Sequence, residues 1–229
     1  MEQEDHSRVV ELTKNGPVVC GSTDVLRRCF EAQRCVVLRS LLSPELLEEA
    51  QRKVGRAQWQ NGDDYTDGAG TVLTSRDTSG ANALHFLLNN AEFLKLVAAV
   101  TGCEEISEFR FGAIYRMLPK DGHQLSWHDD LNDKENRQVG LSLNLSTEVF
   151  DGGAFQIREH LTKAAIAQVN NTGFGDALLF RVSRDLEHRV TAVAGAVPKT
   201  AFTGWFCATG QTHLNRLIDR LNEDRAAAR

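Results

Sequence analysis

Eight residues in the second half of the chain, Val139-Gly-Leu-Ser-Leu-Asn-Leu-Ser146, decide the fold class. Apolar side chains alternate here with small or polar ones, and this is the period of a β-strand. The three leucines then share one face of the strand, and the two serines and the asparagine share the other. The leucine face predicts packing on a hydrophobic core. The polar face fits either the lining of a barrel or an outer surface, and the pattern leaves both open.

Segments of the same kind precede and follow this stretch, with turn signals between them. Gly, Asp, Asn and Pro gather at 119–122, 150–153 and 170–175, where the chain is expected to reverse. The further strands that we expect lie at 106–115, 125–131, 154–158, 176–180, 188–194 and 200–207. A series of about eight short strands separated by turns favours a jelly-roll sandwich or barrel, with helices bracing one sheet.

The residues before 106 predict helices rather than a second domain. Helical spacing of apolar residues is present at 24–33, 43–54 and 91–101, and the second of these helices opens on Ser43-Pro44, an N-cap followed by proline at the first helical position. We therefore predict one mainly β domain over 1–229. Residues 1–105 supply an N-terminal arm and the bracing helices, 106–210 the β core, and 211–229 a C-terminal helix.

A long polar segment, 58–80, interrupts the helical region. It is rich in Gly, Asp, Asn, Thr and Ser and shows little periodicity. Long loops in compact domains are usually either functional or disordered. A lid over a site and a surface excursion therefore both remain open for this segment.

Composition excludes several classes of protein. No apolar run approaches the roughly 20 residues that a helix needs to cross a bilayer, and the polar N-terminus lacks the apolar centre of a signal peptide. The net charge is −5 and no basic block occurs, so we expect neither a membrane nor a nucleic-acid partner. The five scattered cysteines form no zinc-binding spacing and are typical of reduced thiols. We expect a cytoplasmic protein.

A possible metal site begins directly after a tryptophan in the predicted strand 125–131. His128 and Asp130 are two residues apart, so in an extended strand their side chains reach the same face. A second imidazole, from His188 on a neighbouring strand, would complete a site of two histidines and one carboxylate. Such a site leaves metal positions open and is typical of non-haem Fe(II) oxygenases, although zinc could accept the same ligands. Taken alone, the His-x-Asp pattern is also a common coincidence.

The sequence from about 110 to 207 resembles the Fe(II)/2-oxoglutarate-dependent dioxygenase superfamily, and within it the prolyl-hydroxylase-like branch. Six segments carry the resemblance in the expected order: Trp127-His-Asp-Asp130, Val139-Gly-Leu-Ser-Leu-Asn-Leu-Ser146, Phe150-Asp-Gly-Gly-Ala-Phe-Gln-Ile157, Gly175-Asp-Ala-Leu-Leu-Phe180, His188-Arg-Val190 and Lys199-Thr-Ala-Phe-Thr-Gly-Trp-Phe206. The resemblance implies a double-stranded β-helix core. It also implies that His128, Asp130 and His188 are the catalytic iron ligands.

The resemblance further implies a basic anchor for the distal carboxylate of 2-oxoglutarate, because a buried carboxylate must be paired. Lys199 occupies that place, and Arg189 is the alternative, although it should point away from the site in a strand. Other expected contacts of the cosubstrate are Tyr115, Asn144 and Thr203. Thr203 would replace a hydroxyl residue that many members carry where this chain has Ala201.

The activity implied is hydroxylation of an unactivated C–H bond, coupled to decarboxylation of 2-oxoglutarate to succinate and CO2. Fe(II), 2-oxoglutarate and O2 would be required, and ascorbate is a possible addition. The substrate expected is a prolyl or other residue of a protein or peptide, with a free amino acid or natural-product metabolite as the alternative. Two readings of other classes also remain: a cupin-like metal-dependent hydrolase or isomerase that does not use 2-oxoglutarate, and a non-catalytic binding module. An intact ligand set argues against the latter.

Overall fold

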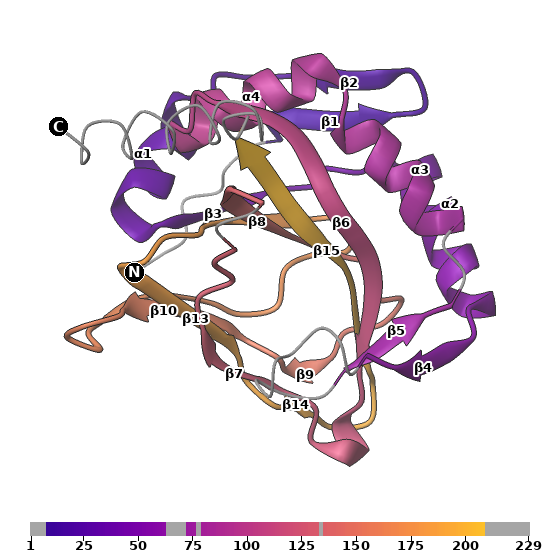
Figure 1. The fold of residues 1–229 in the computed structure, drawn as a ribbon. Helices are drawn as coiled ribbons and strands as arrows, with labels where there is room; N and C mark the ends of the chain where they lie inside the picture. Colours follow the sequence, from indigo (N-terminus) through magenta and orange to yellow (C-terminus); the bar gives the residue numbers. More distant parts are fainter. Residues whose placement is uncertain (1–7, 63–71, 77–78, 133–134, 209–229) are drawn as a thin grey trace, which may run out of the picture.

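Two antiparallel sheets facing one another form the centre of the fold (Figure 1). The computed structural model describes residues 8–62, 72–76, 79–132 and 135–208. The larger sheet runs in the order β3 (Cys35–Leu38), β12 (Ala177–Arg181), β8 (Arg137–Asn144), β15 (Lys199–Ala208), β6 (Ile106–Met117), β5 (Leu73–Ser75) and β4 (Trp59–Asn61). The smaller sheet runs in the order β11 (Ala165–Val169), β10 (Phe155–Glu159), β13 (Leu186–Val190) and β7 (Leu125–His128). This arrangement confirms the mainly β, jelly-roll fold class that the sequence predicts.

Short elements connect and cover these sheets. The first described elements are β1 (Val10–Thr13) and β2 (Gly16–Val19), which form a hairpin, and a small sheet joins β9 (Asp151–Gly152) to β14 (Val193–Ala194). A single 3-10 turn, η2 (Pro119–Asp121), links β6 to β7. The helices within the described residues are α1 (Asp24–Gln33), α2 (Pro44–Arg56), α3 (Ser79–Leu88) and α4 (Ala91–Thr101), and they gather on one side of the larger sheet (Figure 1).

The helix boundaries follow from capping residues in the sequence. The hydroxyl of Ser43 accepts a hydrogen bond from the backbone N–H of Leu46 and caps α2. The side chain of Asn90 caps α4 in the same way, through the N–H of Glu92. Gly102 ends α4 with φ at 68°, a left-handed conformation in which glycine carries no Cβ penalty.

The two faces of β8 separate the hydrophobic core from the interior between the sheets. Leu141 and Leu143 are at most 1% exposed and belong to the core cluster that the helices share with Phe202 and Phe206 of β15. The opposite face carries Ser142 and Asn144 toward the space between the two sheets. The polar face therefore lines the interior, which decides between the two alternatives that the sequence pattern leaves open.

Strand β6 departs from the alternation that its sequence predicts. Ala113 pairs with Thr203 of β15, but the next pair along β15 joins Trp205 to Arg110, so β6 carries an extra residue. Phe111 lies in this bulge with φ at 57°, and 46% of it is exposed, whereas Phe109 is buried. An uninterrupted alternation would put Phe109 and Phe111 on the same face, but the bulge re-aims the side chains on its two sides.

The polar segment 58–80 is only partly a loop. It contributes β4 and β5, which extend the larger sheet beyond β6, and α3 begins at Ser79. Residues 63–71 and 77–78 of the predicted lid lie outside the described residues, as does the predicted C-terminal helix at 211–229.

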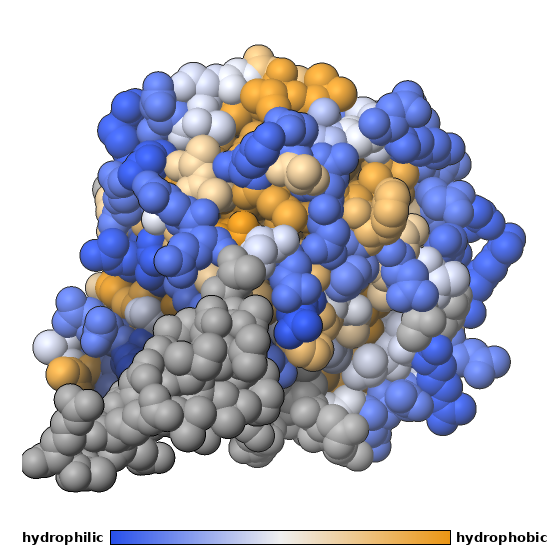
Figure 2. Space-filling model, turned by 45° about the horizontal axis from the view of Figure 1, so that its top comes forward, coloured by the Kyte–Doolittle hydropathy of each residue, from blue (hydrophilic) through white to orange (hydrophobic). Residues whose placement is uncertain are grey.

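The surface seen from the side of the helices is mostly hydrophilic, with hydrophobic side chains gathered near the middle of this face (Figure 2). Within the described ranges, no single helix is both long and apolar enough to cross a membrane. The pair α3 and α4 passes that test together, but the two helices are bent by 68° at their break.

Candidate active site

His128, Asp130 and His188 meet where β7 and β13 run side by side. His128 and His188 are directly paired across the two strands, and their ring centroids are 4.3 Å apart. The Asp130 carboxylate lies between the imidazoles, with Oδ1 3.5 Å from Nε2 of His128 and Oδ2 3.3 Å from Nε2 of His188. One donor atom from each residue lies within 4.8 Å of the other two. Two imidazoles and one carboxylate fit the donor set of a non-haem iron.

Asp130 reaches this position by a route that the sequence does not predict. Strand β7 ends at His128, and Asp130 has φ at 58°, in the left-handed region. The preceding Asp129 side chain accepts a hydrogen bond from the N–H of Leu131 and stabilises the turn. A turn, rather than a shared strand face, therefore brings the carboxylate beside the imidazole.

Neighbouring groups orient both imidazoles. Nδ1 of His128 lies 2.6 Å from the backbone carbonyl oxygen of Ser126, so Nδ1 carries the proton and Nε2 presents its lone pair to the site. The ring of His188 stacks on Phe155 at 5.5 Å and contacts Phe180 at 4.6 Å. These contacts fix the two rings before any ligand binds.

The electrostatics of the triad favour a bound cation. Burial by itself would raise the pKa of Asp130, but the charges and hydrogen bonds of His188 and His128 outweigh it and hold that pKa well below its usual range. Burial would likewise lower the pKa of His128, but hydrogen bonding and attraction to Asp130 outweigh burial and raise it. The metal-free site thus holds an ionised carboxylate that attracts positive charge, which a metal ion would supply.

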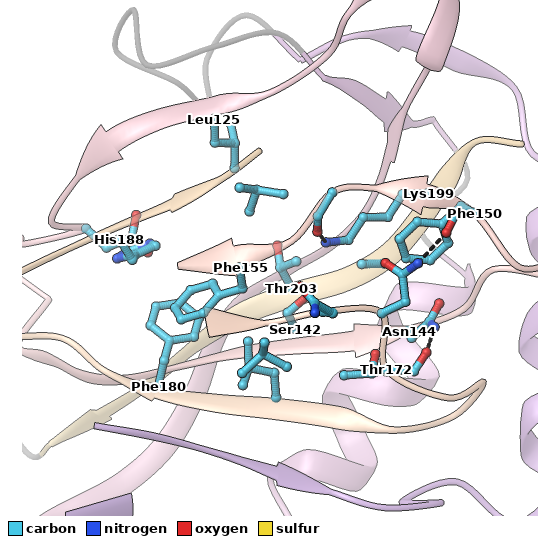
Figure 3. Close-up of a pocket in the computed structure, with 18 of the residues that line it drawn as sticks. Leu125, Ser142, Asn144, Phe150, Phe155, Thr172, Phe180, His188, Lys199 and Thr203 are labelled. Carbon is cyan, nitrogen blue, oxygen red and sulfur yellow. Dashed lines mark hydrogen bonds and ion pairs between the residues drawn. The ribbon is translucent and has the colours of Figure 1, made fainter. Parts of the chain in front are cut away.

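A cavity extends from the triad between the two sheets (Figure 3). It encloses about 70 Å³, whereas one buried water needs only about 10–15 Å³ by the same measure. Phe150, Phe155 and Phe180 supply much of its apolar wall. His188 stands at one end, and Lys199 and Asn144 lie together at the other (Figure 3). The cavity can therefore take a small ligand that touches both the triad and a cation.

Lys199 is the cation at the far end of this cavity. Its ammonium donates to the backbone carbonyl oxygen of Gly153 at 2.6 Å and lies 5.7 Å from the ring centre of Phe150. Burial lowers the pKa of Lys199 to about 8. No ion pair joins it to an acid among the residues described, and an ammonium has three hydrogens to donate. A partly buried ammonium without an acidic partner among the described residues is suited to a carboxylate ligand.

The Gly-Gly turn makes room for this lysine. Gly153 has φ at 62°, and a Cβ on it would stand 3.0 Å from Cδ of Lys199. Gly152 has φ at 70°, and a Cβ there would stand 2.2 Å from the carbonyl oxygen of Ala192. Any larger residue at either position would be strained and would displace its neighbours.

The other predicted contacts of the cosubstrate divide into two groups. Asn144 and Thr203 line the cavity, and the Asn144 amide already donates to the carbonyl oxygen of Thr172 and accepts from the N–H of Ser146. Tyr115 is not in the cavity wall. It packs beside Val72, Met117 and Leu125, and burial raises its pKa to about 12. The roles of all three toward the cosubstrate stay predictions.

Arg189, the alternative anchor, points away from the cavity. Its Nε donates to the side-chain oxygen of Gln156 at 2.6 Å, and its guanidinium lies 4.7 Å from the ring centre of Trp127. Arg158 covers the same ring at 3.9 Å and pairs with Glu187. Both arginines therefore belong to the outer face of the smaller sheet, and this leaves Lys199 as the anchor candidate.

One residue of the site was not identified from the sequence. Trp205 is buried, and its indole N–H donates to Oδ2 of Asp130 at 2.9 Å. The alternation of β15 contains a signal for this, because Lys199, Ala201, Thr203 and Trp205 fall on the same strand face.

Comparison with known proteins agrees with this geometry. Residues 112–207 match the 2OG-Fe(II) oxygenase superfamily, and none of the curated proteins compared with the chain matches it. A prolyl-4-hydroxylase from Pseudomonas putida has a TM-score of 0.61 at 16% identity, covering 82% of this chain and 100% of that one. A prolyl hydroxylase from Trichoplax adhaerens, in complex with a hypoxia inducible factor oxygen degradation domain peptide fragment, has a TM-score of 0.59 at 14% identity, covering 81% and 89%.

A third solved structure of this fold is that of an epimerase rather than a prolyl hydroxylase. The non-heme alpha ketoglutarate dependent epimerase SnoN from nogalamycin biosynthesis has a TM-score of 0.60 at 13% identity, covering 81% of this chain and 83% of that one. At these identities the structures share the fold with this chain. The family match spans the His-Asp-His triad and Lys199, so residues 112–207 of this chain are similar to the 2OG-Fe(II) oxygenase superfamily over the whole of this site.

Proposed function

We propose that this oxygenase is a hydroxylase that inserts one oxygen atom of O2 into an unactivated C–H bond and consumes 2-oxoglutarate. The balanced reaction converts substrate, 2-oxoglutarate and O2 into hydroxylated substrate, succinate and CO2. The observation that carries the proposal is Lys199, a partly buried ammonium in the same cavity as the His-Asp-His triad. A cavity with metal ligands at one end and a cation at the other matches a keto acid whose second carboxylate is distant from its chelating end.

Different residues of the chain would bind the metal, pair with the cosubstrate and exclude water. Iron, held by His128, Asp130 and His188, supplies the redox chemistry with 2-oxoglutarate and O2 when all are bound. Lys199 pairs with the distal carboxylate, which would otherwise be buried without a partner. The aromatic wall of the cavity keeps water away from the reacting groups.

The substrate that we propose is a prolyl or other residue in a protein or peptide. The fold likeness to two prolyl hydroxylases, one of them in complex with a peptide, supports this choice. The alternative is a free amino acid or natural-product metabolite, and the likeness to an epimerase of nogalamycin biosynthesis favours it. A metal-dependent hydrolase would have no use for the partly buried Lys199, so we place that reading last.

Succinate formation tests the proposal. The Fe(II)-loaded protein is given 2-oxoglutarate together with proline-containing peptides in one series and free amino acids in the other, each with and without ascorbate. We expect one series to stimulate succinate release and to gain the mass of one oxygen atom. His188→Ala should abolish both signals. Substrate-stimulated succinate release by that variant would contradict the proposed function.

A further inference from the structure

The indole of Trp205 is hydrogen-bonded to Asp130, the carboxylate that completes the triad. Its N–H donates to Oδ2 of Asp130 at 2.9 Å, and the residue is only 5% exposed. A hydrogen bond to a charged acceptor is among the stronger ones in proteins, and here water has little access to replace it. Oδ2 of Asp130 thus has a fixed protein donor.

Arg137 holds the tryptophan in this position. Its guanidinium lies 3.7 Å from the ring centre of Trp205 and is itself paired with Glu135 at 2.6 Å. Arg137 also donates to the backbone carbonyl oxygen of Asp130 at 3.3 Å. Arg137 of β8 pairs with Cys207 of β15, and this register brings the guanidinium of Arg137 over the ring of Trp205. Two neighbouring side chains therefore hold Asp130, one at its carboxylate and one at its backbone.

The two carboxylate oxygens each lie beside one imidazole, but the hydrogen bond from the indole goes to Oδ2. Oδ2 accepts from the indole N–H and lies 3.3 Å from Nε2 of His188, whereas Oδ1 lies 3.5 Å from Nε2 of His128. A carboxylate can bind a metal through one oxygen or through both. If both bound, Asp130 and the two histidines would occupy four positions of an octahedral ion and leave two. A chelating keto acid needs two positions and O2 needs a third.

We propose that Trp205 is a positioning residue that restricts Asp130 to one-oxygen coordination, through Oδ1, and so keeps three metal positions open. This inference rests on the proposed function, because it takes the triad to be a metal site. Partners of metal-bound carboxylates contribute to affinity as well as to geometry, and their loss typically costs 10- to 100-fold.

Metal affinity tests the inference without reference to turnover. Binding of Mn²⁺ is measured by electron paramagnetic resonance for the wild type, Trp205→Phe, Trp127→Phe and His188→Ala. Trp205→Phe keeps an aromatic ring but removes the N–H, and we expect its affinity to fall roughly 10- to 100-fold. Trp127→Phe is the matched control. Trp127 precedes His128 in the sequence, but its ring contacts Arg158 and Arg189. The affinity of this variant for Mn²⁺ should therefore stay within about twofold of the wild type.

The outcomes separate the inference from the function on which it rests. A wild type that binds no Mn²⁺, or binds it as weakly as His188→Ala, would overturn the proposed function. A wild type that binds Mn²⁺ normally and a folded Trp205→Phe that binds it equally well would overturn only the role of Trp205.

Two further measurements do not depend on how well Trp205→Phe folds. Replacement of Trp205 by benzothienylalanine exchanges the N–H for sulfur in a ring of nearly the same size, and the same loss of affinity is expected. In the wild type, the indole N–H resonance of Trp205 should move when diamagnetic Zn²⁺ binds, because its acceptor becomes a metal ligand. The resonances of the other tryptophans, identified with Trp59→Phe and Trp127→Phe, give the comparison. A Trp205 resonance unmoved by bound Zn²⁺ would contradict the inference.

Discussion

Lys199→Met removes the one cation that the described cavity-lining residues offer to a distal carboxylate. Methionine keeps an unbranched side chain of similar length, so the cavity wall should stay filled. Only the ammonium is lost, together with its hydrogen bond to the carbonyl oxygen of Gly153. The cavity then still offers the triad to the keto-acid end of 2-oxoglutarate but offers no charge to its other end.

The size of the effect follows from the kind of interaction lost. A hydrogen bond to a charged group contributes about 1.5–3 kcal/mol, and each 1.4 kcal/mol is tenfold in affinity. We therefore expect the Kd for 2-oxoglutarate to rise roughly 10- to 150-fold in Lys199→Met. Arg189→Met, which removes a cation from the outer face of the smaller sheet, should leave the Kd unchanged.

The pH dependence of binding gives a second readout of the same residue. Burial lowers the pKa of Lys199 to about 8, so above that pH the free protein holds a neutral amine and must take up a proton to pair with the carboxylate. The Kd of the wild type should therefore rise about tenfold per pH unit above pH 8. Lys199→Arg stays charged and should show no such rise.

Calorimetric titration of the Mn²⁺-loaded protein with 2-oxoglutarate measures these constants directly. The reasoning fails if Lys199→Met binds within about twofold of the wild type, or if Arg189→Met loses as much affinity as Lys199→Met does.

Three further outcomes follow from the structure. Between pH 8 and 10.5 the unfolding free energy of the metal-free wild type should rise by about 3 kcal/mol relative to that of Lys199→Met. The reason is that in this window Lys199 is protonated in the unfolded chain but neutral in the folded protein. Unfolding free energies that change equally with pH in the two proteins would count against this. Asp176→Ala should lower the unfolding free energy by about 3 kcal/mol or more. The buried carboxylate of Asp176 accepts hydrogen bonds from the N–H groups of Ser40 and Gly173 and pairs with Arg39, and all three partners would lose it. A urea midpoint close to that of the wild type would contradict this expectation. Phe202→Ala should cost about 3–5 kcal/mol, because this fully buried ring packs between the larger sheet and the helices, and thermal unfolding of the variant provides the check.

The parts of the fold predicted from the sequence are those that depend on simple periodicity. The alternation of 139–146 places its leucines in the core because the polar residues between them need a different environment, and the structure has this arrangement. The capping signals at Ser43 and Gly102 mark real helix ends. The helix α3 was not predicted, although Ala81, Leu84 and Leu88 are buried at helical spacing, because the glycine and polar residues before it resemble those of a loop.

The parts that could not be predicted depend on contacts distant in the sequence. The spacing of His128 and Asp130 indicated a shared strand face, but the strand ends between them and a left-handed residue completes the site. The extra residue in β6 leaves no mark in the local pattern of that strand, because only its pairing with β15 reveals it. The hydrogen bond of Trp205 to Asp130 joins two residues that are 75 positions apart.

The measurement that tests the central claim most directly is an anaerobic titration of the Fe(II)-loaded protein with 2-oxoglutarate, followed by visible absorption. Chelation of ferrous iron by a keto acid gives a charge-transfer band that neither component has alone. The account predicts that this band appears and saturates in the wild type, needs a higher 2-oxoglutarate concentration in Lys199→Met, and does not form in His188→Ala. A wild type that binds Fe(II) but gives no band at any concentration of 2-oxoglutarate would contradict it.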